Sequence, residues 1–113
     1  MTDKKTFSDE DVVNIHAISE TLLKDTLLTT VINDELQDTI NTRVKILKTL
    51  AVEDGWDIDD EIINIIAQTY TILIINMNYE YKFKDDNTMF KMNGLRILYA
   101  LQENSKGILE DFT

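Results

Sequence analysis

Apolar residues recur at helical spacing along most of the chain, beginning soon after the N-terminus. Ser8 can cap a helix there, Asp11 can return the hydrogen bond three residues later, and Phe7 can pack against Val12. Acidic residues fill the first turn, where the helix dipole favours anions. The pattern therefore predicts a first helix over residues 8–29.

A second helix is predicted over residues 34–52, with Asn33 as its cap. Arg43, Lys45 and Lys48 are predicted to lie mostly off its apolar face, toward the end of the helix that favours cations. The face expected to be buried consists of Leu36, Ile40, Val44, Leu47, Leu50 and Ala51.

The break that follows contains Gly55, which suits a left-handed residue after a helix, and Asp57, which can cap a third helix over residues 58–78. Apolar residues occur on nearly every side of this helix, so we expect it to be central and contacted by all the others. The β-branched residues from 69 onward would equally suit a buried strand, and length favours the helix.

Beyond the third helix the period changes to two, because Tyr79, Tyr81 and Phe83 alternate with charged residues. A short strand or extended arm near residues 78–84 is therefore an alternative, which leaves residues 69–83 open between helix and strand.

A last helix is predicted over residues 88–103, ending at residues 104–107. Gly94 would weaken it unless a neighbouring helix approaches closely there. The tail is unusually apolar, so it either packs back on the bundle or docks elsewhere. Four residues of the helix are expected to face inward, Phe90, Ile97, Leu98 and Leu101, and three carry the apolar tail, Ile108, Leu109 and Phe112.

The elements together predict an all-α fold, a single four-helix bundle-like domain over residues 1–113. The 21 acidic and 11 basic residues give a formal net charge of −10, which repels nucleic-acid phosphates and suits a basic protein surface. No cysteine is present, which excludes disulfides, thiol catalysis and cysteine-bound zinc.

No secretory signal is recognisable in the polar and charged N-terminal residues. The most apolar stretch, residues 62–79, is interrupted by Asn, Gln and Thr, so we interpret it as a buried element rather than a membrane span. We therefore expect an intracellular protein (bacterial cytoplasm) or a virion component.

Candidate chemistry is sparse. His16 and Glu20 lie one helical turn apart, but a metal site needs three or four ligands, so we expect a partly exposed surface histidine. There is no glycine-rich phosphate loop and no histidine beside a candidate nucleophile. We accordingly predict a non-catalytic protein with no cofactor and no bound metal.

Six acids and no base lie between Glu53 and Glu61. Helix capping and dipole complementarity account for most of them, and an interaction patch for a basic partner is the alternative. Trp56, inside this run, either covers the edge of the core or anchors an interface. The candidate protein-interaction residues are Trp56, Asp57, Asp59, Asp60, Tyr79, Tyr81, Phe83 and Phe112.

The segment Trp56–Ile63, a turn that opens an apolar helix, is followed by Tyr79–Tyr81. Over residues 50–104 the chain thereby resembles the small head–tail connector (neck adaptor) proteins of tailed bacteriophages. The resemblance implies assembly into a ring beneath the portal, through helix faces and an extended arm. The long first helix does not match that pattern, and no functional residue is carried over.

Three functions remain open. The first is a structural or assembly subunit that binds copies of itself or neighbouring subunits, which an acidic middle and a more basic C-terminal third would suit. The second is a small acidic inhibitor of the anti-restriction, anti-CRISPR or immunity type, which would bind a basic protein surface. The third, an enzyme or metal bundle, has only His16 and nearby carboxylates in its favour.

Overall fold

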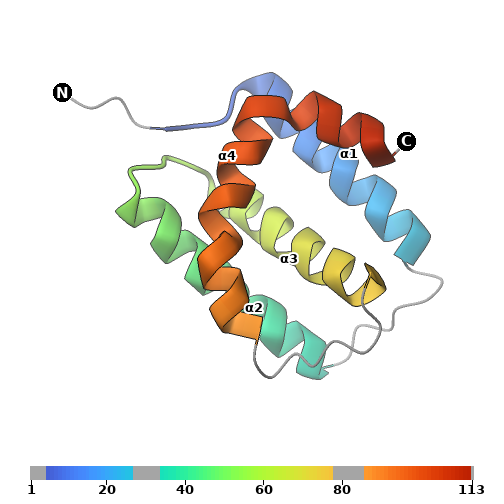
Figure 1. The fold of residues 1–113 in the computed structure, drawn as a ribbon, viewed down its shortest axis with the longest axis vertical. Coiled ribbons are helices and arrows are strands. Elements are labelled where there is room, and N and C mark those ends of the chain that lie inside the picture. The colour runs from blue at the N-terminus through green and yellow to red at the C-terminus, as the bar shows by residue number, and fades with distance from the viewer. Residues whose placement is uncertain (1–4, 27–33, 78–85, 113) are drawn as a thin grey trace.

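In a computed structural model the described residues of the chain form four helices (Figure 1). Residues 5–26, 34–77 and 86–112 are described. The helices are α1 (Asp9–Thr26), α2 (Asp34–Glu53), α3 (Asp60–Met77) and α4 (Asp86–Phe112). Within the described ranges the only β-pairing is one isolated bridge between Lys5 and Trp56. The predicted all-α, four-helix bundle-like fold is confirmed.

Helix α3 was predicted to contact all the other helices, and this is only partly observed: its main partners are α1 and α2, and it reaches α4 through the Tyr70 and Phe90 rings, whose centres are 5.6 Å apart. It packs against α1 on one side and α2 on the other, while α4 crosses over and packs against both α1 and α2 (Figure 1). Of residues 62–72, only Asn64 is exposed. The strand alternative is wrong for residues 69–77, which are helical. The proposed arm at residues 78–84 lies outside the described residues.

The capping arrangement predicted for α1 is confirmed. The amide of Asp11 donates to Ser8 Oγ at 3.1 Å, and the amide of Ser8 donates to Asp11 Oδ2 at 3.2 Å. Two donors that no helical bond could satisfy are thereby paired. Phe7 belongs to the buried core and Val12 packs against it.

The buried face of α2 is broader than predicted, because it includes Arg43. This side chain is wholly buried, so the prediction that it lies off the apolar face was wrong. Helical geometry explains the placement, since Arg43 lies three residues after Ile40 and four before Leu47, both of which are buried. Lys45 and Lys48 are exposed, as expected.

A buried polar contact accommodates Arg43. Its Nη1 donates to Thr71 Oγ1 at 3.0 Å, and that hydroxyl donates in turn to the Ala67 carbonyl at 2.8 Å. The guanidinium also lies 5.4 Å from the centre of the Phe90 ring, within the range of a cation–π interaction. Arg43 thus links α2 to α3 and α4.

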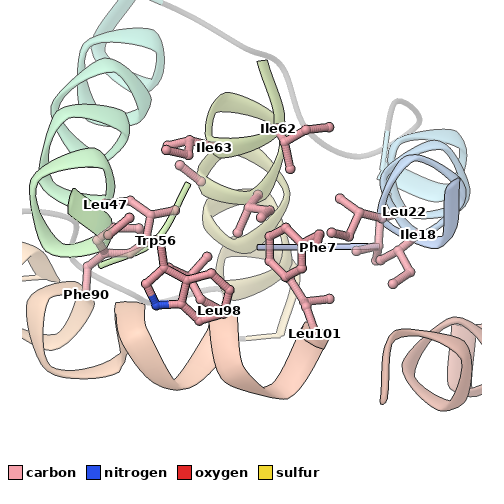
Figure 2. Packing of buried hydrophobic residues seen from close by; sticks show 14 residues of the cluster. Phe7, Ile18, Leu22, Leu47, Trp56, Ile62, Ile63, Phe90, Leu98 and Leu101 are labelled. Atoms are coloured by element: carbon pink, nitrogen blue, oxygen red, sulfur yellow. The ribbon is translucent and has the colours of Figure 1, made fainter. Parts of the chain in front are cut away.

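The hydrophobic core gathers side chains from all four helices and from the segment before α1. Figure 2 shows Phe7 and Trp56 lying beside Leu98 and Leu101 of α4. Gly94 allows α4 to approach α2 closely, because a Cβ there would lie 2.9 Å from Leu50 Cδ1. Of the two alternatives that the sequence left for Gly94, the close approach of a neighbouring helix is the one observed.

Helix α4 does not end at residues 104–107 but bends there. Asn104 has a non-helical backbone (φ −154°, ψ 49°), and the helix continues beyond it to Phe112. Asn104 Oδ1 accepts a hydrogen bond from the Gly107 amide at 3.2 Å, as the cap of a new helix does. An asparagine cap redirects the chain here without ending the helical run.

The segment after the bend returns to α1 (Figure 1). Ser105 is buried, donates to Asp11 Oδ1 at 2.8 Å and accepts from Asn14 Nδ2 at 3.0 Å. Ile108 and Leu109 pack against the core. Of the two alternatives for the tail, packing back on the bundle is therefore correct for these two residues. The side chain of Phe112 lies outside the described part. No described helix has the length and apolar character needed to cross a bilayer.

We expect Thr71→Val to lower the free energy of unfolding by about 1–3 kcal/mol, because buried Arg43 loses an acceptor. Thr49→Val is the matched control, since the exposed Thr49 hydroxyl bonds only the Lys45 carbonyl; it should change stability by less than about 0.5 kcal/mol. Urea unfolding followed by Trp56 fluorescence measures both. Equal effects of the two substitutions would show that the Arg43–Thr71 contact contributes nothing.

The bend in α4 predicts a non-additive pair of substitutions. A Cβ at Gly107 would overlap the side-chain amide of Asn104, so Gly107→Ala should displace the cap and destabilise the protein by about 0.5–2 kcal/mol. In an Asn104→Ala background no cap remains to be displaced, and Gly107→Ala should be neutral or stabilising by up to about 1 kcal/mol. A double-mutant cycle on unfolding free energies tests this. Additive effects would contradict it.

Candidate functional site: the acidic turn between α2 and α3

Residues 53–61, here called the acidic turn, join α2 to α3 and include the first residues of α3. Its backbone leaves α2 through Gly55, whose φ of +82° is the left-handed conformation predicted for it. The amide of Gly55 donates to the Val52 carbonyl at 3.1 Å, and that of Trp56 to the Ala51 carbonyl at 2.9 Å. This pair of bonds is a Schellman motif, which satisfies the last carbonyls of the helix.

The segment before α1 holds the turn from its other side. The amide of Lys5 donates to the Gly55 carbonyl at 3.0 Å, and the amide of Asp57 donates to the Lys5 carbonyl at 2.7 Å. Lys5 and Trp56 thus form an isolated parallel bridge. Because this segment runs directly into the capped start of α1, the turn is tied to the first helix as well as to α2 and α3.

Side chains strengthen the same junction through Asp54. Its Oδ2 accepts hydrogen bonds from the Tyr99 hydroxyl, from Lys5 Nζ at 3.1 Å and from Trp56 Nε1 at 3.1 Å. Lys5 Nζ also donates to the Asp54 carbonyl at 2.8 Å. We call Lys5, Asp54, Trp56 and Tyr99 the Asp54 cluster.

Electrostatics in the cluster favour the charged forms. The Tyr99 hydroxyl, and then Lys5, stabilise the Asp54 carboxylate and hold its pKa below the ordinary 3.8. Contacts with Tyr99 and Asp54 raise the pKa of Lys5 above its ordinary 10.5. Both side chains remain about one-third exposed, so the pair lies at the edge of the core rather than inside it.

Trp56 is buried and is a core residue. It is 5% exposed, with the Phe7 ring at 5.4 Å on one side and the Tyr99 ring edge-on at 5.2 Å on another. Of the two interpretations that the sequence allowed, burial at the edge of the core is the one observed. The indole therefore presents little surface to a partner.

Asp57 was predicted to cap α3, and this was wrong. The helix begins at Asp60, and the amides of Ile62 and Ile63 donate to the carbonyl of Asp59, at 3.0 and 3.1 Å. Asp59 therefore holds the cap position. The backbone amide of Asp57 is bonded to Lys5 instead, which keeps that residue outside the helix.

The remaining acids of the turn point to solvent. The side chains classed as exposed are those of Glu53, Asp57, Asp59, Asp60 and Glu61. Asp60 Oδ2 accepts from Lys48 Nζ at 3.0 Å, and both side chains are largely solvent-accessible. Over the described ranges no ion pair involves the other four carboxylates. The turn thus combines a fixed backbone with uncompensated negative charge.

Other candidate residues lie apart from this site. His16 is half-buried on α1, and within the described part of the chain no three His, Asp or Glu side chains are grouped to hold a metal ion. Tyr79, Tyr81 and Phe83 lie outside the described residues, and Phe112 is the last residue of α4. The Asp54 cluster was missed by sequence reasoning, because nothing distinguishes Asp54 from the acids around it.

The Asp54 cluster predicts a pH-dependent contribution to stability. Folding lowers the pKa of Asp54 below 3.8. The carboxylate therefore stabilises the folded protein above pH 3.8, and this stabilisation is lost as the pH falls through the pKa that Asp54 has in the folded state. Folding raises the pKa of Lys5 above 10.5. The Lys5 ammonium group therefore stabilises the folded protein below pH 10.5, and this stabilisation is lost as the pH rises through the pKa that Lys5 has in the folded state. Asp54→Asn should therefore lower Tm most between about pH 5 and 9, and progressively less below about pH 4.

The control for this experiment is Asp59→Asn, which removes an exposed charge of the same turn while keeping a residue that can cap α3. Thermal unfolding of the three proteins across pH 2–10 gives the comparison. A Tm difference between wild type and Asp54→Asn that stays constant from pH 7 to pH 2 would contradict the assigned role of the carboxylate.

Comparison of the chain with protein-family models, with curated proteins and with solved structures finds no match. The resemblance to phage connectors therefore stays a prediction, and the site is interpreted from its own geometry.

Proposed function

We propose that this chain is a non-catalytic protein that works by binding another protein, and that the acidic turn contacts a basic surface on that partner. One observation carries the proposal: four exposed carboxylates without an ion pair in the described ranges, on a turn whose backbone is held at both ends. Their residues are Glu53, Asp57, Asp59 and Glu61.

The fixed backbone matters for affinity. A loop that must be ordered on binding loses conformational entropy, whereas a turn already held by a Schellman motif and by Lys5 loses little. The charges matter for recognition, because complementary potentials raise the association rate and select against acidic surfaces. A rigid acidic turn is therefore suited to capture of a basic protein.

Several apolar side chains that could have contacted a partner are buried instead, so the proposal is supported by charge rather than by apolar contacts. Trp56 lies in the core, and Ile108 and Leu109 pack against it, so these side chains serve the fold. The exposed acids of the turn, in contrast, keep their side chains in solvent, and among them only Asp60 forms an ion pair within the described residues. This favours an inhibitor-like protein that binds a basic surface.

An assembly subunit that binds copies of itself, as a connector would, is a second candidate, and one observation favours it. A groove of about 300 Å³ between α2 and α4 has Ile46 and Leu50 in its wall and exposed Lys45 and Lys91 beside them. The acidic turn of another copy would find opposite charge there. Such a contact joins two different surfaces and can therefore close into a ring or extend as a stack.

We expect neutralisation of the acidic turn to weaken binding to the partner at least about tenfold, which corresponds to about 1.4 kcal/mol. The test variant combines Glu53→Gln, Asp57→Asn and Asp59→Asn. The control variant combines Glu20→Gln, Asp38→Asn and Glu103→Gln, which removes the same charge from exposed positions outside the acidic turn.

The probes are the purified proteins encoded by neighbouring genes, and this chain itself, with affinities from calorimetry and self-association from light scattering at low and high salt. Binding of a basic protein that is lost in the test variant and kept in the control supports the first candidate. Salt-sensitive self-association that is lost in the test variant and kept in the control variant supports the second candidate, the assembly subunit. Interactions that both variants leave intact would contradict both.

A further inference from the structure

Asp54 is followed directly by Gly55, and this pair of residues has a chemistry of its own. In an unconstrained chain an aspartate before glycine isomerises spontaneously, because glycine has no Cβ to hinder attack by its own amide nitrogen. That nitrogen forms a bond to Cγ of the aspartate while the Cγ–OH bond breaks, and one water molecule is released. The product is a succinimide ring.

Water then opens the ring at one of its two carbonyl carbons. Attack at Cγ restores aspartate, whereas attack at the former main-chain carbonyl carbon leaves isoaspartate, in which the chain runs through Cγ. The water released in the first step balances the water consumed in the second, so neither an oxidant nor a cofactor takes part. Isoaspartate has the mass of aspartate, but its backbone is longer and its carboxylate is attached directly to Cα.

The structure opposes the first step at the carboxyl group. Ring closure proceeds through the protonated carboxyl, from which water can leave, and hardly at all through the carboxylate. The Asp54 Oδ2 atom accepts hydrogen bonds from three donors, and such bonds favour the ionised form and fix its position. The donors are the Tyr99 hydroxyl, Lys5 Nζ at 3.1 Å and Trp56 Nε1 at 3.1 Å.

The structure opposes the same step at the attacking nitrogen. The Gly55 amide donates to the Val52 carbonyl at 3.1 Å, and the preceding amide, that of Asp54, donates to the Leu50 carbonyl at 3.1 Å. The Gly55 nitrogen must lose its proton before it attacks, and its peptide plane must turn toward Cγ. Both changes require the Schellman motif to open. Gly55 is itself exposed, so these bonds, and not exclusion of solvent, protect it.

We propose that the Asp54–Gly55 bond is a spontaneous isomerisation site, kept unreactive by the junction between the segment before α1 and the acidic turn. Opening of the junction exposes the bond to reaction, and isomerisation then makes the opening permanent. The displaced carboxylate no longer meets its three donors, and the longer backbone no longer matches the two bonds that join Lys5 to the turn. The proposal concerns the lifetime of this junction and does not rest on the proposed function.

The test follows isoaspartate formation in the full chain at neutral pH, in native buffer and in guanidinium chloride. Proteolytic peptides are separated by chromatography, and electron-transfer fragmentation distinguishes isoaspartate from aspartate. Because modification follows the population of the opened junction, we expect Asp54 to react at least about a hundredfold more slowly in native buffer than in denaturant. Equal rates in the two conditions would overturn the proposal.

Substitution of a donor separates the junction from folding in general. Lys5→Met removes one donor to Asp54 and should accelerate isoaspartate formation in native buffer about three- to tenfold. Lys48→Met is the matched control, because Lys48 pairs with the exposed Asp60 of the same turn, and it should leave the rate within about twofold. Tyr99→Phe, which removes the hydroxyl donor and keeps the ring, is a second test variant with the same expected direction.

A second glycine bond reports on unfolding of the rest of the chain. Asn93 precedes Gly94 within α4, and asparagine before glycine undergoes the same ring closure with loss of ammonia. With one donor removed, the junction should open before α4 does, so Lys5→Met should accelerate the reaction at Asp54 more than that at Asn93. Equal acceleration at the two sites, or equal effects of Lys5→Met and Lys48→Met at Asp54, would overturn the proposal, because the junction would then give no protection of its own.

Discussion

The rest of the structure depends on the junction where the segment before α1 pairs with the turn between α2 and α3. Two backbone hydrogen bonds of Lys5 and the three donors that converge on Asp54 hold helices that are far apart in the sequence. The same junction places Trp56 between Phe7 and Tyr99, at the edge of the core. Without it, the turn would be held only by the end of α2 and the start of α3.

This constraint also shapes what the surface can do. One acid of the turn, Asp54, is used internally, and fixing it leaves its neighbours pointing outward on a rigid backbone. The acidity of the sequence is thus divided between a structural carboxylate, helix-start positions such as Asp11, and exposed carboxylates that no described base neutralises. Only the last group has a charge available to a partner, which is why the proposed function rests on it.

Features with a local sequence signal could be predicted, and features made by distant contacts could not. The Ser8 cap and the left-handed Gly55 each follow from residues within one or two turns, and each is observed. The roles of Arg43 and Asp54 depend on distant residues: Thr71 lies 28 residues from Arg43, and Tyr99 and Lys5 lie 45 and 49 residues from Asp54. Charge alone suggested exposure for both. The sequence predicts an end of the helix at Asn104 where the structure has a bend, because an asparagine that caps a new helix also breaks the old one.

Amide hydrogen exchange at Lys5 and Asp57, measured by NMR under native conditions, tests the central claim most directly. These two amides donate the bonds that join the N-terminal segment to the acidic turn, and neither belongs to a helix. The account predicts protection comparable to that of Ile66 and Ala67 in the centre of α3, because the junction should open only when the core does. Exchange at the rate of an unstructured peptide, with α3 still protected, would contradict it.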